Sequence, residues 1–85
     1  MSEEQEVGKV VGYFARIGVA AVEATGEFSV GDTLHYKGHT SDFTAPVATM
    51  QIEGADVERV GPGDQVGIKV PERVRDGDLV YRGSG

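Results

Sequence analysis

The stretch Val60–Val70, VGPGDQVGIKV, decides the fold, because a turn signal in it runs directly into the clearest strand pattern of the chain. Pro62 fixes the negative φ needed at the second position of a type II turn, and Gly63 supplies the positive φ needed at the third. Apolar residues then occur at every second position, at Val66, Ile68 and Val70. This alternation predicts a strand with one buried face that begins at the turn.

The glycine-aspartate pair of this turn recurs in FSVGDTLHY, as Gly31-Asp32, and in VRDGDLVYR, as Gly77-Asp78. Each glycine tolerates a left-handed conformation, and each aspartate can accept nearby backbone N–H groups before an apolar run. Three carboxylates could instead bind a hard cation, but calcium loops place their ligands within about a dozen residues. These aspartates are 32 and 14 positions apart. We therefore predict no metal site and seven structural turn residues: Gly31, Asp32, Pro62, Gly63, Asp64, Gly77 and Asp78.

The remainder of the chain predicts an all-β fold. The 13 glycines are spread from Gly8 to Gly85, and no long stretch has the apolar spacing of a helix. Short apolar runs separated by Gly, Asp, Ser and Pro are typical of sandwiches and barrels. We expect strands at residues 7–14, 18–23, 33–37, 43–52, 56–58, 65–70 and 79–82. Pro46 lacks an N–H for the ladder and favours an edge or bulged position.

Closure into a barrel removes exposed strand edges, so we predict a small closed antiparallel β-barrel of about six strands. Phe28 and Phe43, which have polar neighbours near turns, are expected to be exposed. The single domain is expected to span residues 7–82, between a disordered acidic N-terminus (1–6) and a flexible tail (83–85). The predicted core consists of Val10, Phe14, Val22, Leu34, Tyr36, Met50, Ile52, Val66 and Ile68.

Composition limits the class of protein. A chain of 85 residues forms one domain, and the absence of cysteine excludes disulfides and cysteine-based metal sites. No signal peptide and no apolar run of about 18 residues are present, which favours a cytoplasmic protein without a membrane segment. The formal net charge is −6, which opposes nucleic-acid binding, since phosphates are neutralised by Lys and Arg.

Basic residues gather only in residues 57–85, which carry five acidic and five basic side chains. The tentative binding residues for RNA or an acidic partner are Arg59, Lys69, Arg73 and Arg75. Arg73 and Arg75 share a face if their segment is extended. The alternative is a set of solvated loop charges offset by the acidic residues nearby.

Catalytic signals are weak, and we expect no enzyme and no cofactor. His35 and His39 lie on a strand that runs into a glycine turn, so the ligand geometry of a helix is not available to them. Ser29, Ser41 and Thr44 have no nucleophile-elbow sequence around them. No phosphate-binding loop is present, so GTP binding is not expected.

The segments KVVGYF, FSVGDTLHYKG, VATMQIEGADVERVGPGDQVGIKV and VRDGDLVYR together resemble the second, β-barrel domain of translation GTPases of the elongation factor Tu and initiation factor type. The positions that carry the resemblance, over residues 7–82, are Gly31-Asp32, Met50, Pro62-Gly63-Asp64, Val66-Gly67 and Gly77. The chain is also similar to the C-terminal barrel of collagenase-like peptidases, in which FSVGD and VPERVRDGDL have close counterparts.

Two functional hypotheses stay open. The resemblance to translation factors implies an elongation factor-like binding module whose partner is the ribosome or tRNA. The acidic balance and the resemblance to peptidases favour a protein-interaction or accessory module for a separate, catalytic chain. Neither hypothesis involves a nucleotide cofactor.

Overall fold

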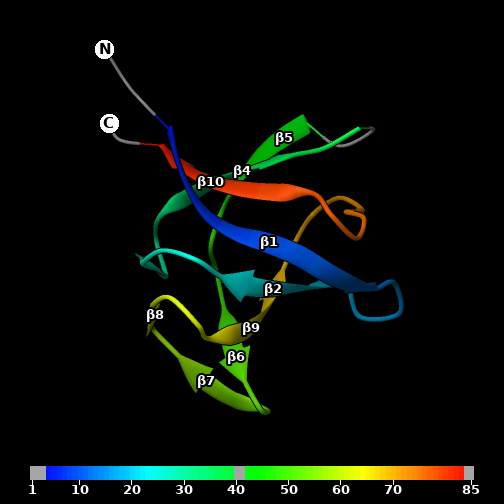
Figure 1. Ribbon diagram of the computed structural model, residues 1–85. Coiled ribbons are helices and arrows are strands. Elements are labelled where there is room, and N and C mark those ends of the chain that lie inside the picture. The colour runs from blue at the N-terminus through cyan, green and yellow to red at the C-terminus, as the bar shows by residue number, and fades with distance from the viewer. Residues whose placement is uncertain (1–3, 40–41, 84–85) are drawn as a thin grey trace.

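The computed structural model describes residues 4–39 and 42–83, which form a curled antiparallel sheet and a small two-stranded ribbon (Figure 1). The sheet has the strand order β5-β4-β10-β1-β2-β9-β6-β7, and the ribbon pairs β3 with β8. Within the described ranges we find no helix that could traverse a bilayer. The strands are β1 (Glu4–Phe14), β2 (Val19–Ala24), β3 (Phe28–Ser29), β4 (Thr33–Lys37), β5 (Asp42–Pro46), β6 (Met50–Ile52), β7 (Ala55–Val57), β8 (Arg59–Val60), β9 (Gln65–Lys69) and β10 (Leu79–Gly83).

The predicted strands 33–37, 65–70 and 79–82 agree with β4, β9 and β10 to within one residue. The predicted strand 43–52 is wrong as a single element, because β5 and β6 lie near opposite edges of the sheet. The ribbon strands β3 and β8 were not predicted, since two residues are too few to show a period. Strand β1 begins at Glu4, while the expectations for residues 1–3 and 84–85, and for Ser41, fall outside the described residues.

The predicted closure into a barrel is wrong. The sheet ends at β5 on one side and at β7 on the other, and no ladder joins these two strands among the described residues. Val47, directly after β5, bonds to the turn before β4: its N–H donates to the carbonyl of Asp32 and its carbonyl accepts from the N–H of Gly31, each at 2.9 Å. The neighbouring Pro46 of β5 lacks the N–H that a further partner strand would need, so β5 remains an edge strand.

The three Gly-Asp turns share one hydrogen-bond arrangement. In each, the aspartate N–H donates to the carbonyl of the residue three positions earlier, and the aspartate carboxylate accepts that residue's N–H. The glycine before each aspartate has a φ of 99°, 93° and 93° in chain order, a left-handed conformation that suits glycine. The two distances are 3.0 and 2.9 Å for Asp32 with Ser29, 3.1 and 2.9 Å for Asp64 with Gly61, and 3.0 and 3.0 Å for Asp78 with Arg75.

Each turn also sets the register of the strand that follows it. The N–H of Gly63 donates to the carbonyl of Ala24 at 2.9 Å, and the N–H of Ala24 donates to the carbonyl of Asp64 at 2.8 Å. The same pair of bonds joins Gly77-Asp78 to Val10 and Gly31-Asp32 to Val47. The three turns thereby extend the ladders of β9 on β2, β10 on β1 and β4 on β5 by one residue pair.

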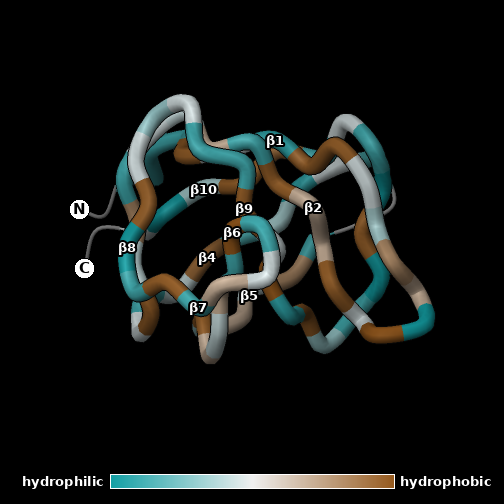
Figure 2. The backbone as a smooth tube through the Cα atoms, turned by 90° about the horizontal axis from the view of Figure 1, so that it is seen from below, coloured by the Kyte–Doolittle hydropathy of each residue, from teal (hydrophilic) through white to brown (hydrophobic). Residues whose placement is uncertain are grey.

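The inner face of the sheet holds the core, and hydrophobic and hydrophilic residues alternate along the strands (Figure 2). Ile52 is half-buried. Phe28 and Val60, which pair across the ribbon, are also buried. The predicted core residues that the structure buries are Val10, Val22, Leu34, Tyr36, Met50, Val66 and Ile68.

Phe14 is 56% exposed, so its assignment to the core is wrong. The register of β1 against β2 shifts between Val10 and Gly12, which marks a β-bulge at Val11. The extra residue inverts the alternation after Val10. As a result Tyr13 packs against the core and Phe14 points outward.

The two phenylalanines predicted to be exposed are not. Phe28 is 1% exposed, because the pairing of β3 with β8 places it beside Val60 in the hydrophobic core. Phe43 is half-buried and stacks on Tyr36, with the ring centroids 5.0 Å apart. The prediction from polar sequence neighbours was therefore wrong for both side chains, because their burial depends on pairing with distant segments.

Asp78 is the one buried charged residue of the described ranges, at 4% exposure. Its carboxylate lies against Gly38, where a β-carbon would overlap it. The carboxylate cannot rotate away without giving up the hydrogen bond from the N–H of Arg75. Gly38, after β4, and the turn before β10 are thus fitted to each other.

We predict that Gly38→Ala lowers the free energy of unfolding by about 1–3 kcal/mol, because overpacking is added to a strained or lost turn bond. Urea unfolding followed by circular dichroism measures the change. Gly83→Ala is the matched control, since a β-carbon there meets nothing within 4 Å. Equal stability of the two variants would contradict the fit between Gly38 and Asp78.

Candidate functional site

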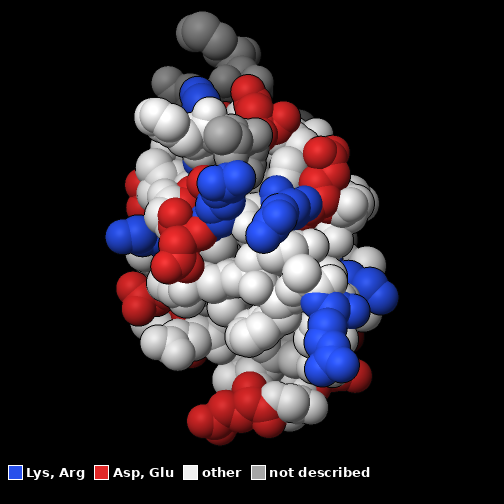
Figure 3. Space-filling view, turned by 90° about the vertical axis from the view of Figure 1, so that its right-hand side faces the viewer, with Lys and Arg blue, Asp and Glu red and all other residues white. Residues whose placement is uncertain are grey.

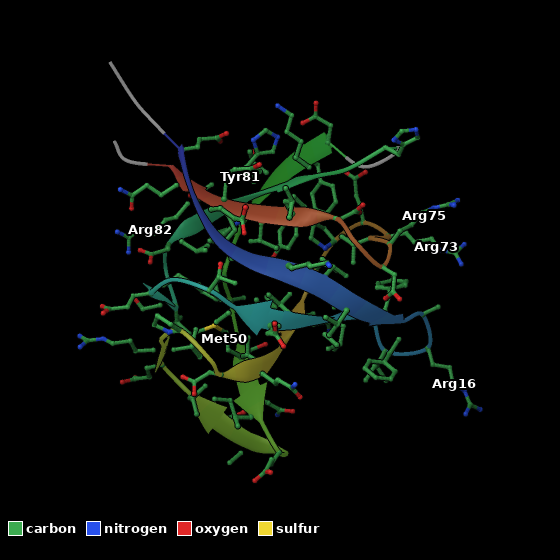
Figure 4. All side chains as sticks on the ribbon, in the orientation of Figure 1. Arg16, Met50, Arg73, Arg75, Tyr81 and Arg82 are labelled. Atoms are coloured by element: carbon green, nitrogen blue, oxygen red, sulfur yellow. The ribbon has the colours of Figure 1, made fainter. Side chains whose placement is uncertain are left out.

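The tentatively assigned cationic residues do not lie together. Arg73 and Arg75 are exposed on the loop between β9 and β10, on either side of the buried Val74, and both project to the same side of the molecule (Figure 4). Arg59 lies in β8, on the opposite side of the same view. Lys69 ends β9 and is paired with Val19 of β2.

Arg16, in the turn between β1 and β2, projects to the same side as Arg73 and Arg75 (Figure 4). Sequence reasoning missed it, because only the folded sheet brings this turn to the side of the β9–β10 loop. The face seen from this side carries Asp and Glu side chains between the Lys and Arg side chains (Figure 3). The charges are therefore mixed rather than gathered into one cationic surface.

His35, on the outer face of β4, is held between two carboxylates, and we call this group the His35 clamp. Its Nδ1 lies 2.8 Å from Glu4 Oε2 at the start of β1, and its Nε2 lies 2.5 Å from Asp42 Oδ1 at the start of β5. The hydrogen bond with Asp42 raises the pKa of His35 above its usual value of 6.5, partial burial opposes this, and Glu4 adds to the increase. The same bond lowers the pKa of Asp42.

The outer face of β1, β2, β9 and β6 has a low floor, because three of the four residues in its central row are Gly or Ala. The pairings Gly12↔Ala21, Ala21↔Gly67 and Gly67↔Gln51 place these four residues in one row across four adjacent strands. A shallow hollow with a volume of about 270 Å³ lies over Ala21, Gly67 and Gln51 of this row, with Val11 and Phe14 beside it. We call it the outer trough.

Taller side chains stand in the neighbouring rows. Phe14, Val19 and Lys69 form the row on one side, and Lys9, Glu23 and Gln65 form the row on the other. The hairpin turn between β6 and β7 closes one end, since its residues Glu53 and Gly54 line the hollow. The trough is thus a built depression and not a flat part of the sheet.

Large apolar side chains are exposed beside the trough. Val11 is 46% exposed, Phe14 56% and Ile17 62%, and all three belong to β1 or the turn after it. Val30, at 41%, is the other large apolar side chain exposed in the described part of the chain, and it lies outside this hairpin. Val11 is exposed because it is the bulged residue of β1.

No protein-family model matches the chain. The chain is 38% identical over 77 residues to an uncharacterized protease of Methanocaldococcus jannaschii, covering 89% of this chain and 19% of that protein. A collagenase of Porphyromonas gingivalis is 37% identical over 78 residues, covering 89% of this chain and 22% of that protein. The chain therefore spans about a fifth of the length of the curated relatives it matches.

Solved structures show the same fold. The C-terminal domain of a putative U32 peptidase of Geobacillus thermoleovorans superposes with a TM-score of 0.87 at 23% identity, covering 92% of this chain and 91% of that one. Its selenomethionine variant gives 0.86 at 24% identity, covering 89% and 96%.

These findings confirm the similarity to the C-terminal domains of collagenase-like peptidases. The elongation factor-like expectation is wrong, since the relatives are peptidases and collagenases, and no relative points to a ribosome or tRNA partner. The residues that carry the resemblance to translation factors do not indicate function, because the Gly-Asp turns among them serve to direct the backbone. A turn that sets strand register says nothing about what the domain binds.

The His35 clamp makes stability depend on pH in a defined direction. Because the carboxylates favour the imidazolium form, the contribution is complete below pH 6.5 and is lost as the pH rises through the raised pKa of His35. On the acid side, the contribution of Asp42 is lost as the pH falls through its lowered pKa. We therefore expect the free energy of unfolding to fall as the pH rises above 6.5 and through the raised pKa of His35.

In His35→Gln this dependence should largely disappear, whereas His39→Gln retains His35 and both carboxylates and should keep it. Urea titrations at a series of pH values give the slope. A His35→Gln variant with the slope of the unmodified protein would contradict the clamp.

Proposed function

We propose that this chain is a non-catalytic accessory module that works with the catalytic part of a peptidase-type protein. The observation that carries the proposal is the extent of the match. Nearly the whole chain, 89% of it, corresponds to only about a fifth of a protease and of collagenases. An all-β domain of this size would supply a binding surface, and the larger remainder of such a protein would supply the chemistry.

The polar groups of the module support this division of work. Both ring nitrogens of His35 face carboxylates, so the imidazole is occupied in joining β4 to β1 and β5. The carboxylates of Asp32, Asp64 and Asp78 accept backbone N–H groups in their turns. These residues are engaged in holding strands, which is a structural and not a catalytic use.

The partner that we propose is a polypeptide. The net charge of −6 and the mixing of acidic with basic side chains in Figure 3 do not favour binding to phosphates. The exposed apolar side chains of the β1–β2 hairpin suit contact with another protein surface.

Two measurements on the purified chain test the proposal. Incubated alone with fluorescein-labelled casein, the chain should release no more fluorescence than a heat-denatured sample. Captured from its own cells after nuclease treatment, it should be recovered with, or as part of, a peptidase-type polypeptide. Hydrolysis by the chain alone, or recovery only with nucleic acid that nuclease removes, would contradict it.

A further inference from the structure

Two exposed apolar side chains, those of Val11 and Phe14, line the outer trough, and Ile17 is exposed in the turn that follows β1. Val11, Phe14 and Ile17 lie within seven positions of the sequence, on the strand and the turn that border the trough. Single exposed apolar residues are ordinary, but a contiguous group beside a depression marks an interaction site. The bulge at Val11 is the cause, because it turns Val11 and Phe14 outward together.

The closed end of the trough is acidic. Glu53 is the one charged residue among those that line it in the described ranges, and it stands at the closed end. In the adjacent row, Glu23 is paired with Lys9 on one side and with Gln65 on the other, and Lys69 stands in the row across the trough, away from Glu53. A cationic side chain is therefore the complementary partner for this end, and its methylene stem would suit the apolar walls.

Glu53 occupies a conformation that does not suit it. Its φ is 51°, and Glu53 is the one residue other than glycine with a positive φ in the described ranges. It precedes Gly54, with a φ of 81°, in the two-residue connection between β6 and β7, where Asn-Gly is preferred. The turn thus carries a carboxylate at a position where the backbone alone would favour Asn or Gly.

We propose that the outer trough binds an extended polypeptide segment in which a Lys or Arg stands between apolar residues. The apolar side chains of the segment contact Val11 and Phe14, and its cation reaches Glu53. Four adjacent strands are about 14 Å across, and an extended chain rises about 3.3 Å per residue, so about four residues fill the trough. The occupant is an unfolded substrate polypeptide, the kind of chain that a peptidase receives.

This identification of the occupant as substrate depends on the function proposed above, whereas the binding itself does not. Peptide binding can be measured on the isolated chain and is independent of the casein and capture experiments. Failure of those experiments would remove the role in proteolysis. Failure of peptide binding would remove the trough as the site.

The probes are the hexapeptide acetyl-GVVRVG-amide and its partner acetyl-GVVEVG-amide, added to ¹⁵N-labelled chain up to about 5 mM, a range suited to weak binding. We expect the amide signals of Gly12, Ala21, Gly67 and Gly54 to shift, with the arginine peptide binding about tenfold more tightly than the glutamate peptide. No shift at these amides, or equal affinity for the two peptides, would overturn the proposal.

Variants separate the binding function from folding. Phe14→Ser should weaken binding of the arginine peptide about tenfold, whereas Val30→Ser, at an exposed apolar residue outside the trough, should leave it unchanged. Glu53→Asn should abolish the preference for arginine and raise the melting temperature, since Asn tolerates a positive φ. An Asn variant that keeps the preference would show that Glu53 does not receive the cation.

The same samples also test whether the trough is occupied by a second copy of the chain. If the trough joins two copies of the chain, the same amides will shift with protein concentration when no peptide is present, and sedimentation velocity will show a dimer. That result would overturn the proposal.

Discussion

The aspartate carboxylate that accepts a backbone N–H within its own turn is the interaction on which the rest of the sheet depends. It occurs at Asp32, Asp64 and Asp78, and each time it leaves the preceding glycine free to bond across to a distant strand. The residues reached in this way, Val10, Ala24 and Val47, are all buried. Three short turns thereby connect local conformation to register between segments far apart in the chain. Three of the strands in the large sheet begin at such a turn, so an error at one of them would displace a whole ladder.

The sheet stays open between β5 and β7. Val47 uses both its N–H and its carbonyl on the turn before β4, which adds one residue pair to the ladder of β4 and β5, and the chain then crosses to β6 near the other edge. The bulge at Val11 determines which side chains of β1 lie on the outer face. It places Tyr13 against the core and exposes Val11 and Phe14 beside a row of small residues. The inner face is thus devoted to packing, and the outer face of β1, β2, β9 and β6 is left for contact with a partner.

Sequence reasoning succeeded where local chemistry determines structure. The turn at Pro62-Gly63 and the alternation of Val66 and Ile68 depend on φ and on side-chain period, and both can be seen in a few residues. Sequence reasoning failed where pairing between distant segments determines whether a side chain is buried. The exposure of Phe14 follows from a bulge that has no sequence signature here, and the burial of Phe28 follows from a two-residue ribbon. The outer trough could not be predicted, because Gly12, Ala21 and Gly67 meet only through the register of three strands.

Native-state hydrogen exchange tests most directly whether the three turns hold the sheet together. The amides of Val10, Ala24 and Val47 each donate to the carbonyl of a turn aspartate. If the turns fix the registers, these three amides will exchange only through global unfolding, as slowly as the amide of Ile68 in the middle of β9. Exchange of all three at the rate of surface loops, with β9 still protected, would contradict the account.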